Sequence, residues 1–131
     1  MAEKGYKTLI VDTDPQCNLT GLCLNTDKGN KLESFYIGNH NNIKEALSPV
    51  FSGALSPLEP ASCYGFEQNS NLYLLPGHID FSEYDATYNI AENLTGSLFM
   101  LKNIPGALRN LLQMTSEKYQ FEYILIDMSP N

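Results

Sequence analysis

The chain has 131 residues, 43% of them hydrophobic, and a formal net charge of −7 at pH 7. This length suits a single domain that can bury a core of its own. No apolar run approaches the roughly 20 residues of a membrane span, and the N-terminus lacks the apolar segment of a signal peptide. The three cysteines lack CxxC spacing, so they favour neither a disulfide framework nor a zinc site and indicate a cytoplasmic protein.

Basic residues are too few for a nucleic-acid surface. The chain has 8 Lys and Arg against 15 Asp and Glu, and its one arginine is Arg109. Clustered Lys and Arg are needed to displace counterions from a phosphate backbone. We therefore expect no direct nucleic-acid surface in this chain, and we interpret its acidity as a source of solubility.

The N-terminal segment predicts the end of a helix and then a strand. Residues 2–4 favour helix, and Gly5 is typical of the position just after a last helical turn. Thr8–Val11 are apolar or β-branched, which predicts a strand covered on both faces. Asp14 precedes a proline, so the strand is expected to end there.

The rest of the chain alternates helical patterns with apolar strands. Before the second strand we predict a helix over 18–24, a loop over 25–42, a helix over 43–51 that Pro49 interrupts, and an irregular stretch over 52–71. From there on we predict a strand over 72–75, a helix over 90–101, a helix that Asn103 caps and whose Leu108, Leu111 and Leu112 face the core, and a strand over 122–126. This alternation predicts an α/β fold with a mostly parallel sheet.

Three carboxylates follow apolar strands. Asp12 and Asp14 follow the first strand, and Asp127 ends the last. The carboxyl ends of parallel strands are the usual place for phosphate and Mg²⁺ chemistry. The two acids could divide the work, so that one faces Mg²⁺ while the other orients a water molecule. The alternative for this pair is an Asx turn that only shapes the bend.

Taken together, these segments resemble the ParA/MinD-type partition ATPases, the deviant-Walker branch of the P-loop NTPases. The resemblance rests on Leu9–Gln16 with Asn18 after it, on the strand Leu72–Gly77, on Lys118–Tyr123, and on a strand like Walker B at Ile124–Asp127. It extends over essentially the whole chain. It implies a three-layer α/β sandwich of the P-loop NTPase type.

The sequence departs from the family pattern in three ways. Cys17 stands where the family more often has Gly, and residues 128–131 replace a small residue followed by Pro-Pro-Ser. No GxxxxGK[ST] phosphate-binding loop is present. We interpret residues 1–131 as a single, partial ParA-like ATPase domain, a middle fragment without the P-loop and the C-terminal half. The fragment is therefore expected to be inactive and to bind neither ATP nor Mg²⁺.

The resemblance implies residue roles in an intact parent protein that hydrolyses ATP to drive plasmid or chromosome partitioning. Asp12 and Asp127 would hold Mg²⁺, Asp14 would orient the attacking water, and Gln16 and Asn18 would shape the switch-like loop at the nucleotide. The parent's partners would be DNA and a centromere-binding protein. For the chain itself we expect self-association, because missing strands leave sheet edges unpaired.

Two other readings stay open. A phosphoacceptor receiver domain also opens with paired acids and carries an acceptor Asp before a proline, as Asp127 does. However, the stretch between Asp14 and Asp127 is far longer than the roughly 40 residues of one βαβ unit. A truncated, non-enzymatic interaction fragment would share the ParA resemblance and differ only in activity.

Overall fold

A four-stranded, mostly parallel sheet forms the centre of the molecule. The computed structural model describes residues 1–28, 41–51, 57–81 and 106–128. The strands are β1 (Thr8–Asp12), β2 (Tyr64–Gly65), β3 (Leu72–Leu75) and β4 (Tyr123–Asp127). Their order in the sheet is β2-β3-β1-β4. β1 runs parallel to both β3 and β4, and only the short β2 is antiparallel, to β3.

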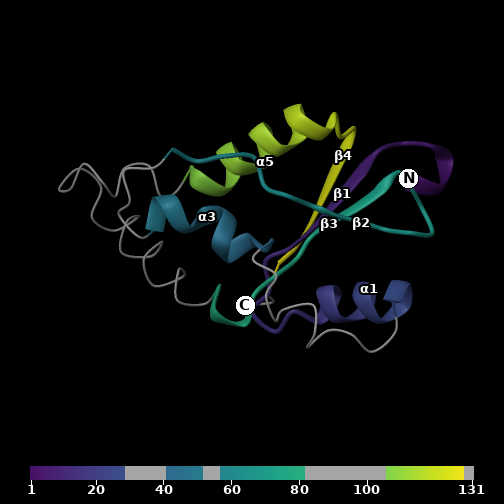
Figure 1. Ribbon diagram of the computed structural model, residues 1–131, viewed down its shortest axis with the longest axis horizontal. Helices are drawn as coiled ribbons and strands as arrows, with labels where there is room; N and C mark the ends of the chain where they lie inside the picture. Colours follow the sequence, from purple (N-terminus) through teal and green to yellow (C-terminus); the bar gives the residue numbers. More distant parts are fainter. Residues whose placement is uncertain (29–40, 52–56, 82–105, 129–131) are drawn as a thin grey trace.

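Helices cover both faces of this sheet, which gives three layers (Figure 1). α3 (Ile43–Phe51) and α5 (Ala107–Tyr119) contact each other on one face, and α1 (Asn18–Lys28) lies on the other. Two short 3₁₀ helices, η1 (Ala2–Lys4) and η2 (Ile79–Phe81), complete the described elements. None of the described helices is long and apolar enough to cross a membrane. The predicted α/β fold with a mostly parallel sheet is confirmed.

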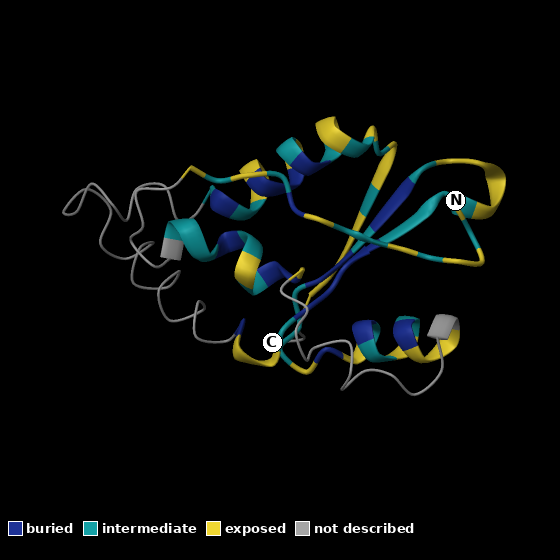
Figure 2. Ribbon diagram, viewed as in Figure 1, coloured by how far each residue is buried: buried dark blue, intermediate teal, exposed yellow. Residues whose placement is uncertain are grey.

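The main core lies between the sheet and the pair α3 and α5. Alternating strand residues point to this side, and the fully buried members of the cluster are Leu9, Val11, Ile43, Leu47, Leu75 and Leu111. Leu74 points to the opposite face and is also fully buried, as is Leu24 of α1. Figure 2 shows β1 as the buried centre of this arrangement.

β4 is partly exposed, unlike β1. Tyr123, Leu125 and Ile126 are 41%, 45% and 43% exposed, and Figure 2 shows β4 mostly as exposed or intermediate. The reason is its place in the sheet, because among the described strands β4 pairs with β1 only and forms one edge. The exposed apolar strand is of the kind expected where a neighbouring strand is missing.

Pro49 does not interrupt its helix, contrary to the prediction. α3 continues through it to Phe51. Proline lacks the N–H that would bond to the carbonyl of Glu45, four residues earlier. The hydroxyl of Ser48 donates to that carbonyl instead, at 2.8 Å. The helix thus keeps the Glu45 carbonyl satisfied despite the proline.

Other boundaries also differ. α1 extends to Lys28, where a loop was predicted from residue 25, and β2 lies within the stretch predicted to be irregular. α5 begins at Ala107 with Gly106 as its N-cap. The predicted cap Asn103 and the predicted helix 90–101 lie outside the described residues. Gly5 was predicted to end the first helical turn and does so, with φ of 90°.

Candidate functional site

The carboxyl ends of β1 and β4 form the candidate site. Asp12 and Asp127 are register partners at the last position of the two strands. The next residue, Thr13, donates both its N–H (3.0 Å) and its hydroxyl (2.7 Å) to the main-chain carbonyl of Asp127. The predicted carboxylates Asp12, Asp14 and Asp127 thus come from the carboxyl ends of these two strands and the loop after β1. Thr13 attaches that loop to the end of β4.

The Asp12 carboxylate is fully buried and accepts three hydrogen bonds. Its Oδ2 accepts from the hydroxyl (2.6 Å) and the N–H (2.9 Å) of Thr20, and its Oδ1 accepts from Asp14 N–H at 3.1 Å. The Thr20 hydroxyl in turn accepts from Gly77 N–H at 2.9 Å. Asp12, Thr20 and Gly77, which we call the Asp12 junction, therefore join the ends of β1 and β3 to the first turn of α1.

The absence of a side chain at Gly77 matters sterically in this junction. A Cβ atom at residue 77 would lie 3.0 Å from Cγ of Asp12 and 3.2 Å from its main-chain oxygen. Only glycine allows the chain after β3 to approach Asp12 so closely. Sequence reasoning noted this glycine as a strand stop but missed its contact, and it did not identify Thr20.

Asp14 makes the Asx turn that was one of the two readings of the acid pair. Its Oδ1 accepts from Gln16 N–H at 2.9 Å, and its carbonyl accepts from Cys17 N–H at the same distance. Cys17 follows in the left-handed region with φ of 55°. This conformation favours glycine, which accounts for the glycine that the family more often has at this position.

The remaining predicted residues are accessible at the same edge. Gln16, Asn18 and Asp127 are exposed, and Asp14 is half-buried. Within the described ranges, no group of three or more His, Cys, Asp or Glu side chains is placed to hold a metal ion. The roles of Asp12 and Asp127 toward Mg²⁺, and of Gln16 and Asn18 toward a nucleotide, stay predictions.

Two half-buried thiols, Cys23 and Cys63, have raised pKa values. Burial raises the pKa of Cys23 in α1, and the negative charge of Asp12 raises it further. Burial also raises the pKa of Cys63 to about 12, although nearby Lys118 lowers it slightly. Both thiols are therefore protonated at neutral pH, which disfavours a nucleophilic role for either.

The site fits only part of an ATP·Mg²⁺ complex. An exposed carboxylate at the end of a parallel strand, as Asp127 is, suits a Mg²⁺ held through water. A triphosphate also needs a glycine-rich loop of N–H groups and a lysine, and the sequence contains no GxxxxGK[ST] pattern. The residues present therefore do not fit the triphosphate by themselves.

Comparison with known proteins agrees with this arrangement. The AAA domain family matches residues 1–131, so the chain belongs to this family of ParA/MinD-like P-loop ATPase domains. The crystal structure of protein DIP2308 from Corynebacterium diphtheriae has the same fold, with a TM-score of 0.77 and 20% sequence identity. The match covers 99% of this chain but only 45% of that one, so the chain spans less than half of that protein's length. A search of curated proteins found no match.

Proposed function

We propose that this chain is the central part of a cytoplasmic ParA-like ATPase, in which Asp14 orients the attacking water and Asp127 holds Mg²⁺ through water. ATP hydrolysis by the intact protein would drive plasmid or chromosome partitioning, with DNA and a centromere-binding protein as partners. The chain alone would bind ATP weakly or not at all, because the phosphate-binding loop is missing from its sequence.

The observation that carries this proposal is the double hydrogen bond from Thr13 to the carbonyl of Asp127. It ties the loop that presents Asp14 to the strand that presents Asp127. A water-orienting carboxylate and a metal-holding carboxylate must act on the same phosphate group, so a fixed spacing between them is a requirement of the chemistry.

The exposed outer edge of β4 gives independent support. A parallel strand paired there would cover Leu125 and Ile126 and would end beside Asp127. In the resembling family a strand of this sheet leads into the P-loop. A P-loop delivered next to β4 would supply the missing N–H groups and lysine at the carboxyl edge.

The test begins with the reading frame upstream of the codon for Met1, where a lysine-rich P-loop should be encoded. The protein extended by that segment should hydrolyse ATP with Mg²⁺. Asp14→Ala should abolish turnover and leave ATP affinity within about threefold, because it removes water positioning and leaves the phosphate contacts in place.

Asp80→Ala in the extended protein is the matched control, since Asp80 is an exposed acid in η2. It should leave both quantities unchanged. Equal loss of binding and turnover in Asp14→Ala would show a structural role for Asp14. An upstream frame without a P-loop would contradict the proposal as a whole.

A further inference from the structure

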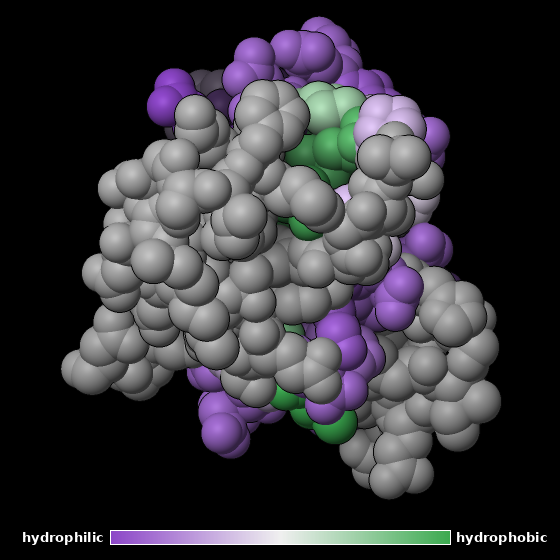
Figure 3. All heavy atoms as spheres, turned by 90° about the vertical axis from the view of Figure 1, so that its left-hand side faces the viewer, coloured by the Kyte–Doolittle hydropathy of each residue, from purple (hydrophilic) through white to green (hydrophobic). Residues whose placement is uncertain are grey.

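A cavity lies between α3 and the irregular segment 57–62, and its lining shares no residue with the candidate site described above. Its volume is about 360 Å³, within the usual range for small ligands. The lining residues that matter for binding are Asn42, Glu45, Pro49, Pro57, Glu59 and Pro60. Figure 3 views the molecule from this end and shows both hydrophobic and hydrophilic atoms among the described residues.

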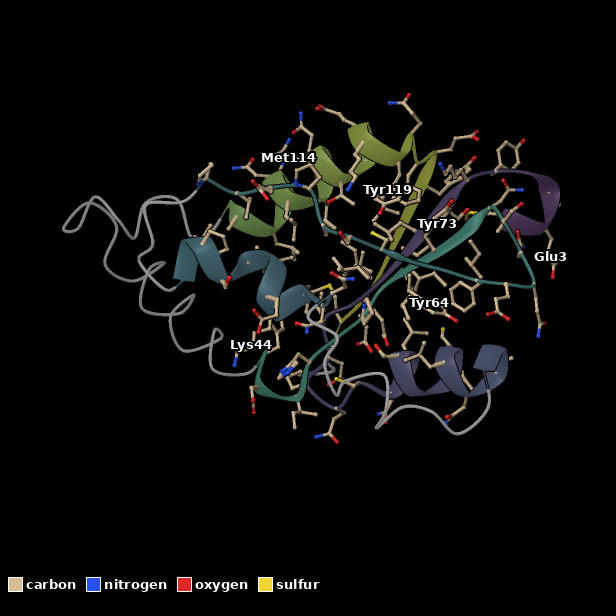
Figure 4. All side chains as sticks on the ribbon, viewed as in Figure 1. Glu3, Lys44, Tyr64, Tyr73, Met114 and Tyr119 are labelled. Carbon is tan, nitrogen blue, oxygen red and sulfur yellow. The ribbon has the colours of Figure 1, made fainter. Side chains whose placement is uncertain are left out.

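α5 holds one wall of this cavity in place. The hydroxyl of Thr115, which is fully buried, accepts from Ala61 N–H at 3.0 Å. Two residues on, Cys63 N–H donates to the hydroxyl of Tyr119 at 3.1 Å. Figure 4 shows Tyr119 close to Tyr73 of β3, and their ring centroids are 5.4 Å apart. This wall of the cavity is therefore attached to α5 at Ala61 and Cys63.

Asn42 contributes a buried donor for which the described residues supply no acceptor. The residue is 4% exposed and caps α3, because its Oδ1 accepts from Glu45 N–H at 3.0 Å. Because the terminal atom that accepts this bond must be the amide oxygen, the other terminal atom of the Asn42 side chain is the donor Nδ2. Within the described part of the chain, Nδ2 has no acceptor. A buried donor without a partner costs about 1–3 kcal/mol, so an acceptor supplied by a ligand would bind favourably.

The charge at the cavity is negative. Glu45 and Glu59 are exposed, and they are the charged residues among the described lining. The neighbouring Lys44 forms an ion pair with Asp80, with 3.8 Å between its Nζ and the carboxylate. No ion pair to Glu45 or Glu59 is found among the residues that the structure describes.

We propose that this cavity binds a basic residue of a peptide. The guanidinium or ammonium group would lie between the carboxylates of Glu45 and Glu59, and its aliphatic stem would pack on the prolines. A main-chain carbonyl of the same peptide would accept from Nδ2 of Asn42. A free anion is disfavoured by the two carboxylates, and a simple amine would leave the Asn42 donor unpaired.

The probe is the tripeptide acetyl-Gly-Arg-Gly-amide, titrated into the full chain and followed by calorimetry and by the NMR signals of the Asn42 side-chain amide. We expect saturable binding that shifts those signals. The citrulline analogue, which lacks the charge, and propylguanidine, which keeps the single charge but lacks the carbonyl, should each bind at least about tenfold more weakly.

Two variants keep the fold while removing one contact each. Asn42→Ser retains an oxygen that caps α3 but removes the Nδ2 donor, and Glu59→Gln removes one charge. Each should weaken the arginine peptide about tenfold, whereas Glu67→Gln, at an exposed acid outside the cavity, should have no effect. Equal binding of propylguanidine, unchanged affinity in both variants, or no binding of the peptide at millimolar concentration would overturn the proposal. The proposed ATPase function would be unaffected by these results.

Discussion

Thr20→Val tests the Asp12 junction most directly, because valine has nearly the shape of threonine without its hydroxyl. The variant removes a hydrogen bond to a buried carboxylate, worth about 1.5–3 kcal/mol, and removes the hydroxyl that accepts from the Gly77 N–H, at about 1–3 kcal/mol. We expect a loss of about 3–5 kcal/mol in the free energy of unfolding. This is a large share of the roughly 5–15 kcal/mol typical of a domain.

The assay is urea unfolding followed by circular dichroism, with Thr20→Ser as the control. Serine keeps the hydroxyl and loses one buried methyl, which should cost about 1 kcal/mol. With a slope of roughly 1–3 kcal/mol/M, the valine variant should unfold at a midpoint lower by at least about 1 M. If the valine variant does not fold while the serine variant does, the reasoning stands. If both lose the same stability, the junction contributes nothing through its hydroxyl and the argument fails.

Four further predictions concern other parts of the molecule. Thr115→Val should lower stability by about 1–3 kcal/mol in urea unfolding, because it leaves Ala61 N–H buried without an acceptor, and an effect below 0.5 kcal/mol would contradict this. Because the pKa of Cys63 is raised in the folded state, the unfolded chain loses its thiol proton at lower pH than the folded chain does. The free energy of unfolding should therefore fall between about pH 9 and pH 12, by up to about 1.4 kcal/mol per pH unit. Cys63→Ala should show less of this loss. Calorimetry of the chain with ATP and Mg²⁺ should show no micromolar affinity. Sedimentation should show self-association that Leu125→Lys on β4 reduces, and a clean monomer before substitution would refute it.

The fold was predictable to the extent that it depends on apolar strands. Thr8–Val11 and Leu72–Leu75 are apolar or β-branched runs with clear stops, so their existence and approximate bounds follow from the sequence. That a strand edge would be left uncovered was expected from the missing strands, but its place at β4 was not, because a strand's own residues do not encode its neighbours in the sheet. The helix through Pro49 was missed for a different reason: the pattern of residues does not show that the Ser48 hydroxyl bonds to the Glu45 carbonyl, which the proline cannot serve.

The candidate site, too, was predictable from the sequence only in part. The acids Asp12, Asp14 and Asp127 were found because a polar residue at the end of an apolar run is a visible signal. Thr20 was missed, since a single threonine in a short helix carries no pattern of its own. Its contact with Asp12 spans eight positions and forms only when α1 packs on the sheet.

The pairing of β4 links the side edge of the sheet to its carboxyl end. Among the described strands, the strand that ends at Asp127 pairs with β1 alone, and Thr13 joins that end to the Asp14 loop. A segment that added a strand beside β4 would therefore contact the strand that carries Asp127. Through the two bonds of Thr13, its attachment would bear on both acids at once.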